Sequence, residues 1–193
     1  MKTNESRLVE PSEAYRRSFV EAIREFQADS YSLNAGGMGK YRGLNIEDLE
    51  ADFGGYLRDL AEAAEESKLK PGLVPQTTYW LVEGPDFIGR VSLRHRLNDD
   101  LMRIGGQIGY EIRPSMRRRG YGTQALRLGL AKARDLGLER ILVTCDSVNL
   151  PSRKIIERNG GVFEDELAYS DDKPPKHRFW IDVTAARGRD GRR

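Results

Sequence analysis

Three consecutive arginines beside two glycines carry the most specific chemistry in this sequence. The segment Arg117-Arg-Arg-Gly120-Tyr-Gly122 lies between Pro114, which ends an alternating apolar pattern, and a run with helical periodicity. Glycines let a backbone approach a ligand closely, and the first turn of a helix presents unpaired N–H groups at the positive end of its dipole. A strand, a basic loop and a glycine-opened helix together predict an anion site, with phosphate groups as its ligand.

Three side chains near this segment are candidates for a general base. Glu111 lies on the expected central strand, His95 ends an earlier strand, and Asp146 closes the following one. A carboxylate or an imidazole within reach can take a proton from a reacting group. Each also has a structural interpretation: an ion pair with an arginine for Glu111, a structural role for His95, and a helix cap for Asp146. The sequence leaves the choice among them open.

Composition excludes several classes of protein. The formal net charge of +2 is too small to predict a specific nucleic-acid or membrane partner. No run approaches the ~18 apolar residues of a membrane span, and the first residues lack an apolar signal region, so the expected location is cytoplasmic. Cys145 is the single cysteine, which excludes an internal disulfide and a cysteine-cluster metal site. We expect no metal.

Periodicity and turn signals predict the elements that position these residues. The expected order is a strand at 8–9, helices at 12–26 and 45–64, strands at 78–83, 88–95 and 107–113, a helix at 120–136, a strand at 140–146, a short helix after 149, and strands at 162–163 and 178–183. This order predicts a mixed α/β fold around one central sheet. We expect one domain over residues 1–183 and a basic, disordered tail at 184–193. The glycine-rich stretch 31–44 fits either a plain loop or a lid.

The glycine segment formally matches a second pattern. Gly120-Tyr-Gly122-Thr-Gln-Ala125 fits the Gly-x-Gly-x-x-Ala motif of dinucleotide-binding folds, and Asp146 stands about where a ribose-binding acid would lie. Those folds place the first glycine directly after the strand, whereas the segment Arg113–Arg119 intervenes here. The upstream strands also form a meander rather than strand–helix units. A dinucleotide-dependent oxidoreductase is therefore the weaker interpretation.

The same segment resembles the Gln/Arg-x-x-Gly-x-Gly/Ala signature of the GNAT superfamily of N-acetyltransferases. Downstream, Asn149-Leu-Pro-Ser152 and Asn159-Gly160-Gly161 resemble the second block of that family, and the two blocks span about residues 105–163. Further residues resemble a bacterial branch of predicted acetyltransferases: Arg94-His95, Gly105-Gly106, Tyr110 and Thr144-Cys145-Asp146.

The resemblance implies acetyl-CoA as co-substrate and a mostly antiparallel central sheet that splays between its fourth and fifth strands, flanked by helices. Backbone N–H groups of the arginine–glycine loop would cradle the pyrophosphate, and the pantetheine arm would pair with the strand edge near Ile112. The implied cofactor-binding residues are Ile112, Arg113, Arg117, Arg118, Arg119, Gly120, Tyr121, Gly122, Thr123, Asn149, Ser152 and Arg153.

The resemblance also implies direct acyl transfer to a primary amine, of a protein or a small molecule, in a ternary complex. The Ile112 N–H would stabilise the oxyanion. The family's usual acid, a tyrosine seven residues after the asparagine, is replaced here by Ile156, as in branches that have serine at the position of Ser152. This loss keeps a non-catalytic acyl-CoA-binding or regulatory module open as an alternative. The amine acceptor is unassigned, and a homodimer is compatible with the sequence.

Overall fold

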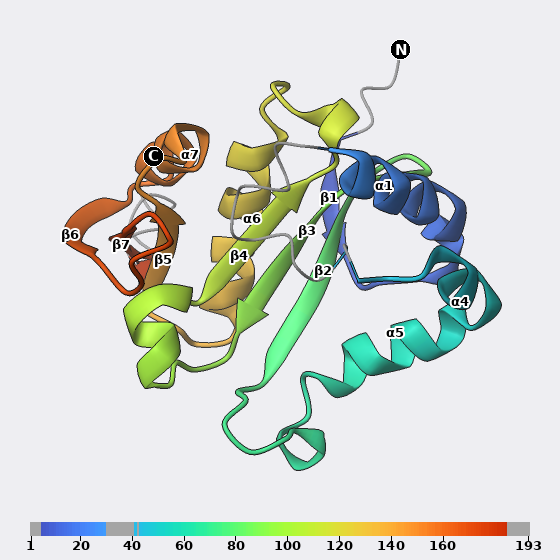
Figure 1. Ribbon diagram of the computed structural model, residues 1–193, viewed down its shortest axis with the longest axis horizontal. Coiled ribbons are helices and arrows are strands. Elements are labelled where there is room, and N and C mark those ends of the chain that lie inside the picture. Colours follow the sequence, from blue (N-terminus) through green and yellow to red (C-terminus); the bar gives the residue numbers. More distant parts are fainter. Residues whose placement is uncertain (1–4, 30–40, 42, 185–193) are drawn as a thin grey trace, which may run out of the picture.

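In the part of the chain that the structure describes, seven strands form two antiparallel sheets. The computed structural model describes residues 5–29, 41 and 43–184. The strands are β1 (Arg7–Val9), β2 (Gln76–Glu83), β3 (Asp86–Arg94), β4 (Ile108–Ile112), β5 (Arg140–Asp146), β6 (Val162–Leu167) and β7 (Lys176–Asp182). They pair in the orders β1-β2-β3-β4 and β5-β7-β6 (Figure 1). The mixed α/β fold expected from the sequence is confirmed.

Some of the α-helices begin at a side-chain cap and others do not. The α-helices are α1 (Arg16–Ala28), α4 (Ile46–Ala51), α5 (Phe53–Glu62), α6 (Tyr121–Asp135) and α7 (Leu150–Arg158). The predicted single helix over 45–64 is wrong, because it divides at Asp52. The Asp52 side chain accepts a hydrogen bond from the Gly55 N–H at 2.7 Å and starts a second helix there. A π-helical turn, Leu101–Gly105, was not predicted either.

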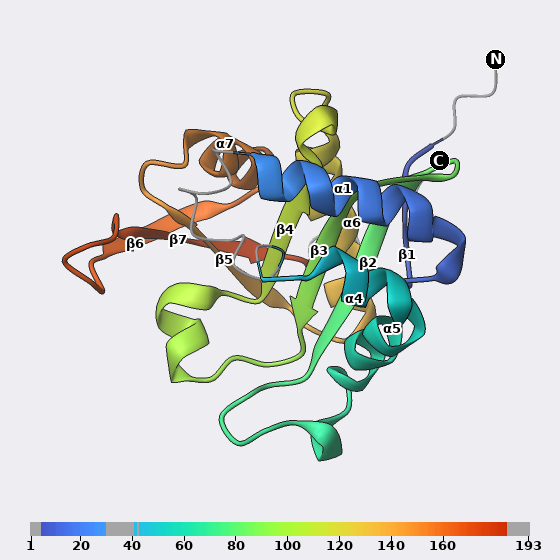
Figure 2. The ribbon, with the colours of Figure 1, turned by 45° about the vertical axis from the view of Figure 1, so that its right-hand side comes forward.

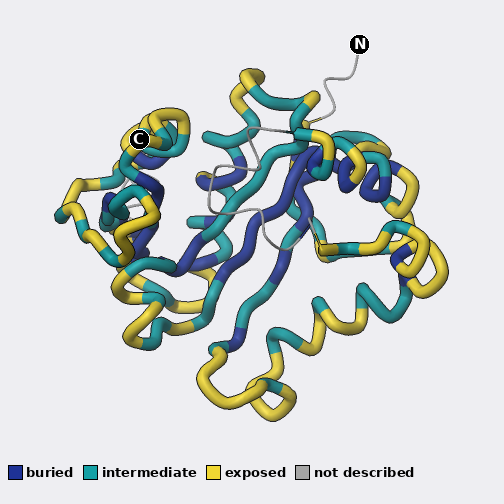
Figure 3. Tube along the Cα trace, in the orientation of Figure 1, coloured by how far each residue is buried: buried dark blue, intermediate teal, exposed yellow. Residues whose placement is uncertain are grey.

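Alternating side chains of the first sheet face two different helical layers. Trp80 and Val82 of β2 pack into a cluster with α1, α4 and α5, whereas Leu81 packs into the cluster beneath α6. Figure 2 shows α1, α4 and α5 together in front of this sheet. The buried residues concentrate along its central strands (Figure 3). Side chains of β3 and β4 therefore face either the α1 layer or the α6 layer, according to their place in the alternation.

The strands β4 and β5 meet only where β4 begins. The Gln107 N–H donates to the Leu142 carbonyl at 2.7 Å, and the Leu142 N–H donates to Gln107 Oε1 at 2.9 Å. Gly106 has a φ of +66°, and a Cβ there would lie 2.8 Å from the Leu142 oxygen, so this close approach requires glycine. No ladder joins the two strands among the described residues, and they diverge (Figure 1). The predicted splay is confirmed.

Some predictions lie outside what the structure describes. Most of the stretch 31–44 falls in residues 30–40 and 42, and the tail falls in 185–193. The single domain over 1–183 stays a prediction. Within the described parts of the chain, no helix has both the length and the apolar character needed to cross a membrane.

Candidate cofactor and acyl-transfer site

The edge of β4 that faces the gap carries backbone groups that β3 does not use. The Arg113 N–H donates to the Ile88 carbonyl at 2.9 Å, and the Gln107 carbonyl accepts from Arg94 N–H at 2.9 Å. Hydrogen-bonding direction alternates along an antiparallel strand, so the intervening Ile108, Tyr110 and Ile112 direct their backbone groups toward the gap. The structure thus places the Ile112 N–H on the edge where the sequence analysis expected it.

The loop after β4 adopts a conformation that few residues tolerate. Arg118 has a φ of +64° and is the one non-glycine residue with positive φ in the described part of the chain. Gly120 follows with a φ of +87°, and α6 begins at Tyr121. Left-handed residues in such a loop turn successive N–H groups toward one concave side, which is an anion-binding arrangement. A Cβ at Gly120 would meet no atom within 4 Å, so the requirement there is conformational.

Gly122 has a different role, because α6 and α7 pack tightly against each other at this position. A Cβ on Gly122 would lie 2.6 Å from Ile155 Cδ1. The neighbouring Thr123 carbonyl accepts a hydrogen bond from Asn159 Nδ2 at 3.2 Å. The Tyr121 hydroxyl donates to a Glu83 carboxylate oxygen at the end of β2. The start of α6 is therefore fixed on both sides.

Of the five arginines predicted to bind the cofactor, two are paired with acids of α1 or its C-cap. Arg113 Nε lies 2.7 Å from a Glu25 carboxylate oxygen, and Arg117 Nη1 lies 2.6 Å from Asp29. Arg117 Nε also donates to the Ile112 carbonyl at 3.2 Å. Within the described residues, neither Arg118 nor Arg119 forms a salt bridge, so their guanidinium groups remain available to an anion.

The sequence analysis missed the acids on α1 because it considered only the apolar face of that helix. Glu21, Glu25 and Asp29 are spaced four residues apart, which places them on one side of a helix. Arg113 and Arg117 have the same spacing. That matched spacing is a signal in the sequence, although it does not say which acids face which arginines.

The opposite wall of the gap is the N-terminus of α7. Asn149 caps this helix, with its Oδ1 accepting the Ser152 N–H at 3.1 Å. The Ser152 hydroxyl lies 2.8 Å from the Tyr110 hydroxyl, so the pair bridges from α7 to β4. Arg153 pairs with the exposed Glu157 at 2.8 Å. Ile156 is fully buried and presents no hydroxyl to the gap.

Burial raises the pKa values of two groups near the gap, Tyr110 of β4 and Cys145 of β5. It raises the pKa of Tyr110 well above its usual value, although the Ser152 hydrogen bond opposes that shift. Burial also raises the pKa of the Cys145 thiol to about 11. A thiol that stays protonated is a poor nucleophile. Cys145 is therefore unsuited to covalent catalysis, and the Tyr110 hydroxyl stays in its protonated form.

Of the three candidate bases, Glu111 lies nearest the edge position of Ile112. Its Oε2 is 2.9 Å from Arg90 Nη2, and both side chains are about nine-tenths buried on the α1 side of the sheet. The Arg90 guanidinium also lies 5.0 Å from the centre of the buried Tyr41 ring. Glu111 is thus a buried, ion-paired carboxylate next to the gap-facing edge.

The other two candidates are held elsewhere. His95 lies past the end of β3, six residues from the Gly89 that pairs with Ile112, which is roughly 20 Å along a strand. Its Nε2 is 2.8 Å from Thr77 Oγ1, and burial lowers its pKa. Asp146 is buried at the end of β5 and pairs with Lys176 at 2.5 Å. The structure does not bring the three together.

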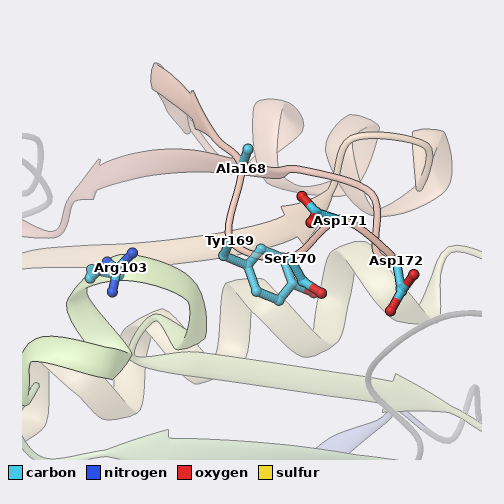
Figure 4. Close-up of a pocket in the computed structure, with 6 residues that line it drawn as sticks. All are labelled: Arg103, Ala168, Tyr169, Ser170, Asp171 and Asp172. Carbon is cyan, nitrogen blue, oxygen red and sulfur yellow. The ribbon is translucent and has the colours of Figure 1, made fainter.

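A cavity of about 540 Å³ lies at the turn between β6 and β7. Figure 4 shows Arg103 of the π-helical turn and the segment that faces it. The lining residues are Arg103, Ala168, Tyr169, Ser170, Asp171 and Asp172. None of the predicted site residues lines it. Among the described residues, no three potential metal ligands gather in one place.

Comparison with known families identifies the class of protein. Residues 44–162, more than half of the chain, match the acetyltransferase (GNAT) domain. The chain belongs to the GNAT acetyltransferase family. The matched residues include the loop between β4 and α6, the gap between β4 and β5, and α7.

Solved structures of GNAT acetyltransferases share the fold over nearly the whole chain. RimL, a ribosomal L7/L12 alpha-N-protein acetyltransferase in complex with coenzyme A, is 15% identical with a TM-score of 0.69, over 96% of this chain and 97% of RimL. MccE, a microcin C7 self-immunity acetyltransferase in complex with acetyl-CoA and AMP, is 16% identical with a TM-score of 0.65, over 93% of each chain.

RimJ from Mycobacterium smegmatis, in complex with CoA-disulfide, is 19% identical with a TM-score of 0.66, over 92% of this chain and 81% of RimJ. No curated protein matches the sequence. At these identities the likeness shows the fold and does not identify the acceptor.

Proposed function

We propose that this GNAT protein transfers the acetyl group of acetyl-CoA directly to a primary amine while both substrates are bound. The observation that carries the proposal is the gap between β4 and β5, which opens beside a left-handed loop at the N-terminus of α6. A strand edge with unused backbone groups suits the amides of pantetheine, and the loop suits a pyrophosphate. No other described part of the chain combines these two features.

The proposed position of the donor is supported by the groups that line the gap. The pyrophosphate lies at the N–H groups from Arg117 to Thr123, a segment that we call the phosphate loop, with the side chains of Arg118 and Arg119 nearby. The Ile112 N–H donates to the acetyl thioester, because Ile112 directs its backbone groups toward the gap. The Ile112 carbonyl already accepts a hydrogen bond from Arg117. Asn149 and Ser152 approach the arm from α7, and Arg153 lies toward the nucleotide end.

The chemistry requires a base for the amine and an acid for the thiolate. Glu111 is our proposed base, acting directly or through water, because it adjoins the edge of β4 and faces the α1 layer. The Ser152–Tyr110 hydroxyl pair is our proposed proton donor to the departing thiolate. We assign Asp146 and His95 to structural roles, because Asp146 pairs with Lys176 and His95 lies past the end of β3, far from Ile112.

The acceptor is a primary amine of a protein or a small molecule. RimL and MccE, the similar proteins named above, act in these two settings, a ribosomal protein and microcin C7 immunity. A cytoplasmic location and a single domain over residues 1–183 are part of this proposal. The domain proposal is supported by the long coverage of the GNAT structures.

Thermal denaturation with added nucleotides tests the donor. We expect acetyl-CoA to raise the melting temperature, because a ligand that binds only the folded state stabilises it, and we expect NAD(H) and NADP(H) to leave it unchanged. Stabilisation by a dinucleotide alone would overturn the proposal. A panel of amines and N-terminal peptides, assayed for release of coenzyme A, then separates an enzyme from a non-catalytic module, which would bind acetyl-CoA without turnover.

A further inference from the structure

One carboxylate of α1 accepts hydrogen bonds from the turn that precedes the phosphate loop and from the residue before that turn. The turn, Pro114–Met116, connects the gap edge of β4 to the loop. Glu25 Oε2 accepts the Ser115 N–H at 2.9 Å, and Glu25 Oε1 accepts the Ser115 hydroxyl at 3.0 Å and Arg113 Nε at 2.7 Å. Glu25 thus ties α1 to both the backbone and the side chains of a segment about 90 residues away.

The geometry indicates that these bonds are formed by the charged carboxylate. Burial alone would raise the pKa of Glu25, but the hydrogen bonds from Ser115 and Arg113 outweigh it and lower that pKa. Hydrogen bonds to an ionised acceptor are the stronger kind. The conformation of the Pro114–Met116 turn is therefore fixed by a group outside the loop itself.

The negative charge of Glu25 and its hydrogen bonds to the turn are expected to affect phosphate binding in opposite directions. A negative charge near bound phosphates weakens their binding by repulsion. A fixed turn strengthens binding, because the loop then needs less ordering when the ligand arrives. Removing Glu25 therefore tightens binding if its charge matters most and weakens binding if its hydrogen bonds matter most.

We propose that Glu25 is a positioning residue for the phosphate loop: it holds Ser115 and Arg113 so that the N–H groups from Arg117 to Thr123 face the pyrophosphate. The proposal rests on the proposed function of this loop. Glu25 is not a catalytic residue, since it acts through the turn and contacts no reacting atom.

Calorimetric titration with coenzyme A tests the proposal on the full chain. We expect Glu25→Ala to raise the Kd by about tenfold, because three hydrogen bonds to the turn are lost. Glu25→Gln keeps the shape and one acceptor oxygen and should give a smaller increase. The matched control is Glu21→Gln, which removes the same charge one helical turn earlier, 3.7 Å from Arg113. Its Kd should change by less than about twofold.

A second ligand separates positioning from general damage to the fold. Pantetheine lacks the pyrophosphate, so its affinity, measured by NMR titration, should be the same in wild type and Glu25→Ala. Weaker binding of both ligands would indicate loss of structure and overturn the proposal. Should Glu25→Ala fail to fold, the isosteric Glu25→Gln decides by the same two ligands.

The outcomes distinguish this proposal from the one on which it rests. A wild-type protein that binds no coenzyme A would overturn the proposed function, and the role of Glu25 with it. Wild-type binding combined with an unchanged or lower Kd in both Glu25 variants would overturn the positioning role alone. A lower Kd would show in addition that the charge of Glu25, rather than its hydrogen bonds, dominates its effect on the phosphates.

Discussion

The phosphate loop and the Arg90–Glu111 pair adjoin the same strand, β4, and in both regions arginines pair with carboxylates. The two regions differ in where those carboxylates lie and in how far the charged side chains are exposed to solvent. At the loop, Arg113 pairs with Glu25 of α1 and Arg117 pairs with Asp29 at the C-cap of that helix, and we propose that backbone N–H groups bind the ligand. In the pair, both charges are buried and neutralise each other. The loop therefore depends on backbone conformation, whereas the pair depends on charge balance.

The largest expected effect tests the dependence of the loop on its backbone. Gly120→Asp should abolish detectable binding of acetyl-CoA, a loss of at least about a hundredfold, because it adds a like charge where phosphates approach and strains a φ of +87°. Gly137→Asp is the matched control at the other end of α6, with a φ of +81° and equal free space. Calorimetry on both proteins measures the difference, and equal losses would place the phosphates elsewhere.

The second prediction tests the charge balance of the buried pair. Glu111→Ala should lower the free energy of unfolding by about 3–5 kcal/mol, because the buried Arg90 charge loses its partner. Glu62→Ala breaks an ion pair of the same 2.9 Å length on the surface, with Lys68, and should cost at most about 1 kcal/mol. Urea denaturation compares the two. Similar losses of unfolding free energy in the two variants would show that burial does not make the Arg90–Glu111 pair more important than the surface pair.

The third prediction concerns the hydroxyl pair of Tyr110 and Ser152, which joins β4 to α7. Ser152→Ala should lower kcat roughly tenfold and leave the KM for acetyl-CoA nearly unchanged, since it removes a proton donor but keeps the N–H that Asn149 caps. Tyr110→Phe should have a similar effect. In the double variant the losses should not add, because the two hydroxyls act as a unit. Additive losses would argue against a shared proton path.

The smallest expected effect concerns strain in the loop. Arg118→Gly should raise the free energy of unfolding by at most about 1 kcal/mol, because glycine adopts a φ of +64° without a steric penalty. Arg119→Gly removes the same charge at a residue without positive φ and should lower stability instead. Both variants should bind coenzyme A severalfold more weakly. If Arg118→Gly is destabilising, the loop stores no strain at that residue.

Local features of the fold could be read from the sequence. The glycine that permits a left-handed loop, the proline that ends β4, and the asparagine that caps α4 act on their immediate neighbours. The helix over 45–64 was predicted as one because its apolar spacing continues through Asp52. The capping hydrogen bond that divides it competes with that pattern and leaves no trace in the spacing.

The sequence by itself determined the segment that should bind phosphates and the class of fold around it, because turns, caps and periodicity are set by neighbours in the chain. The tertiary structure decided which polar and charged side chains contact one another. Glu25 meets Arg113 and Tyr110 meets Ser152 across long sequence separations, and Glu111 is buried against Arg90 of another strand. Such contacts form only when the elements pack together, because packing brings into contact side chains that lie far apart in the sequence.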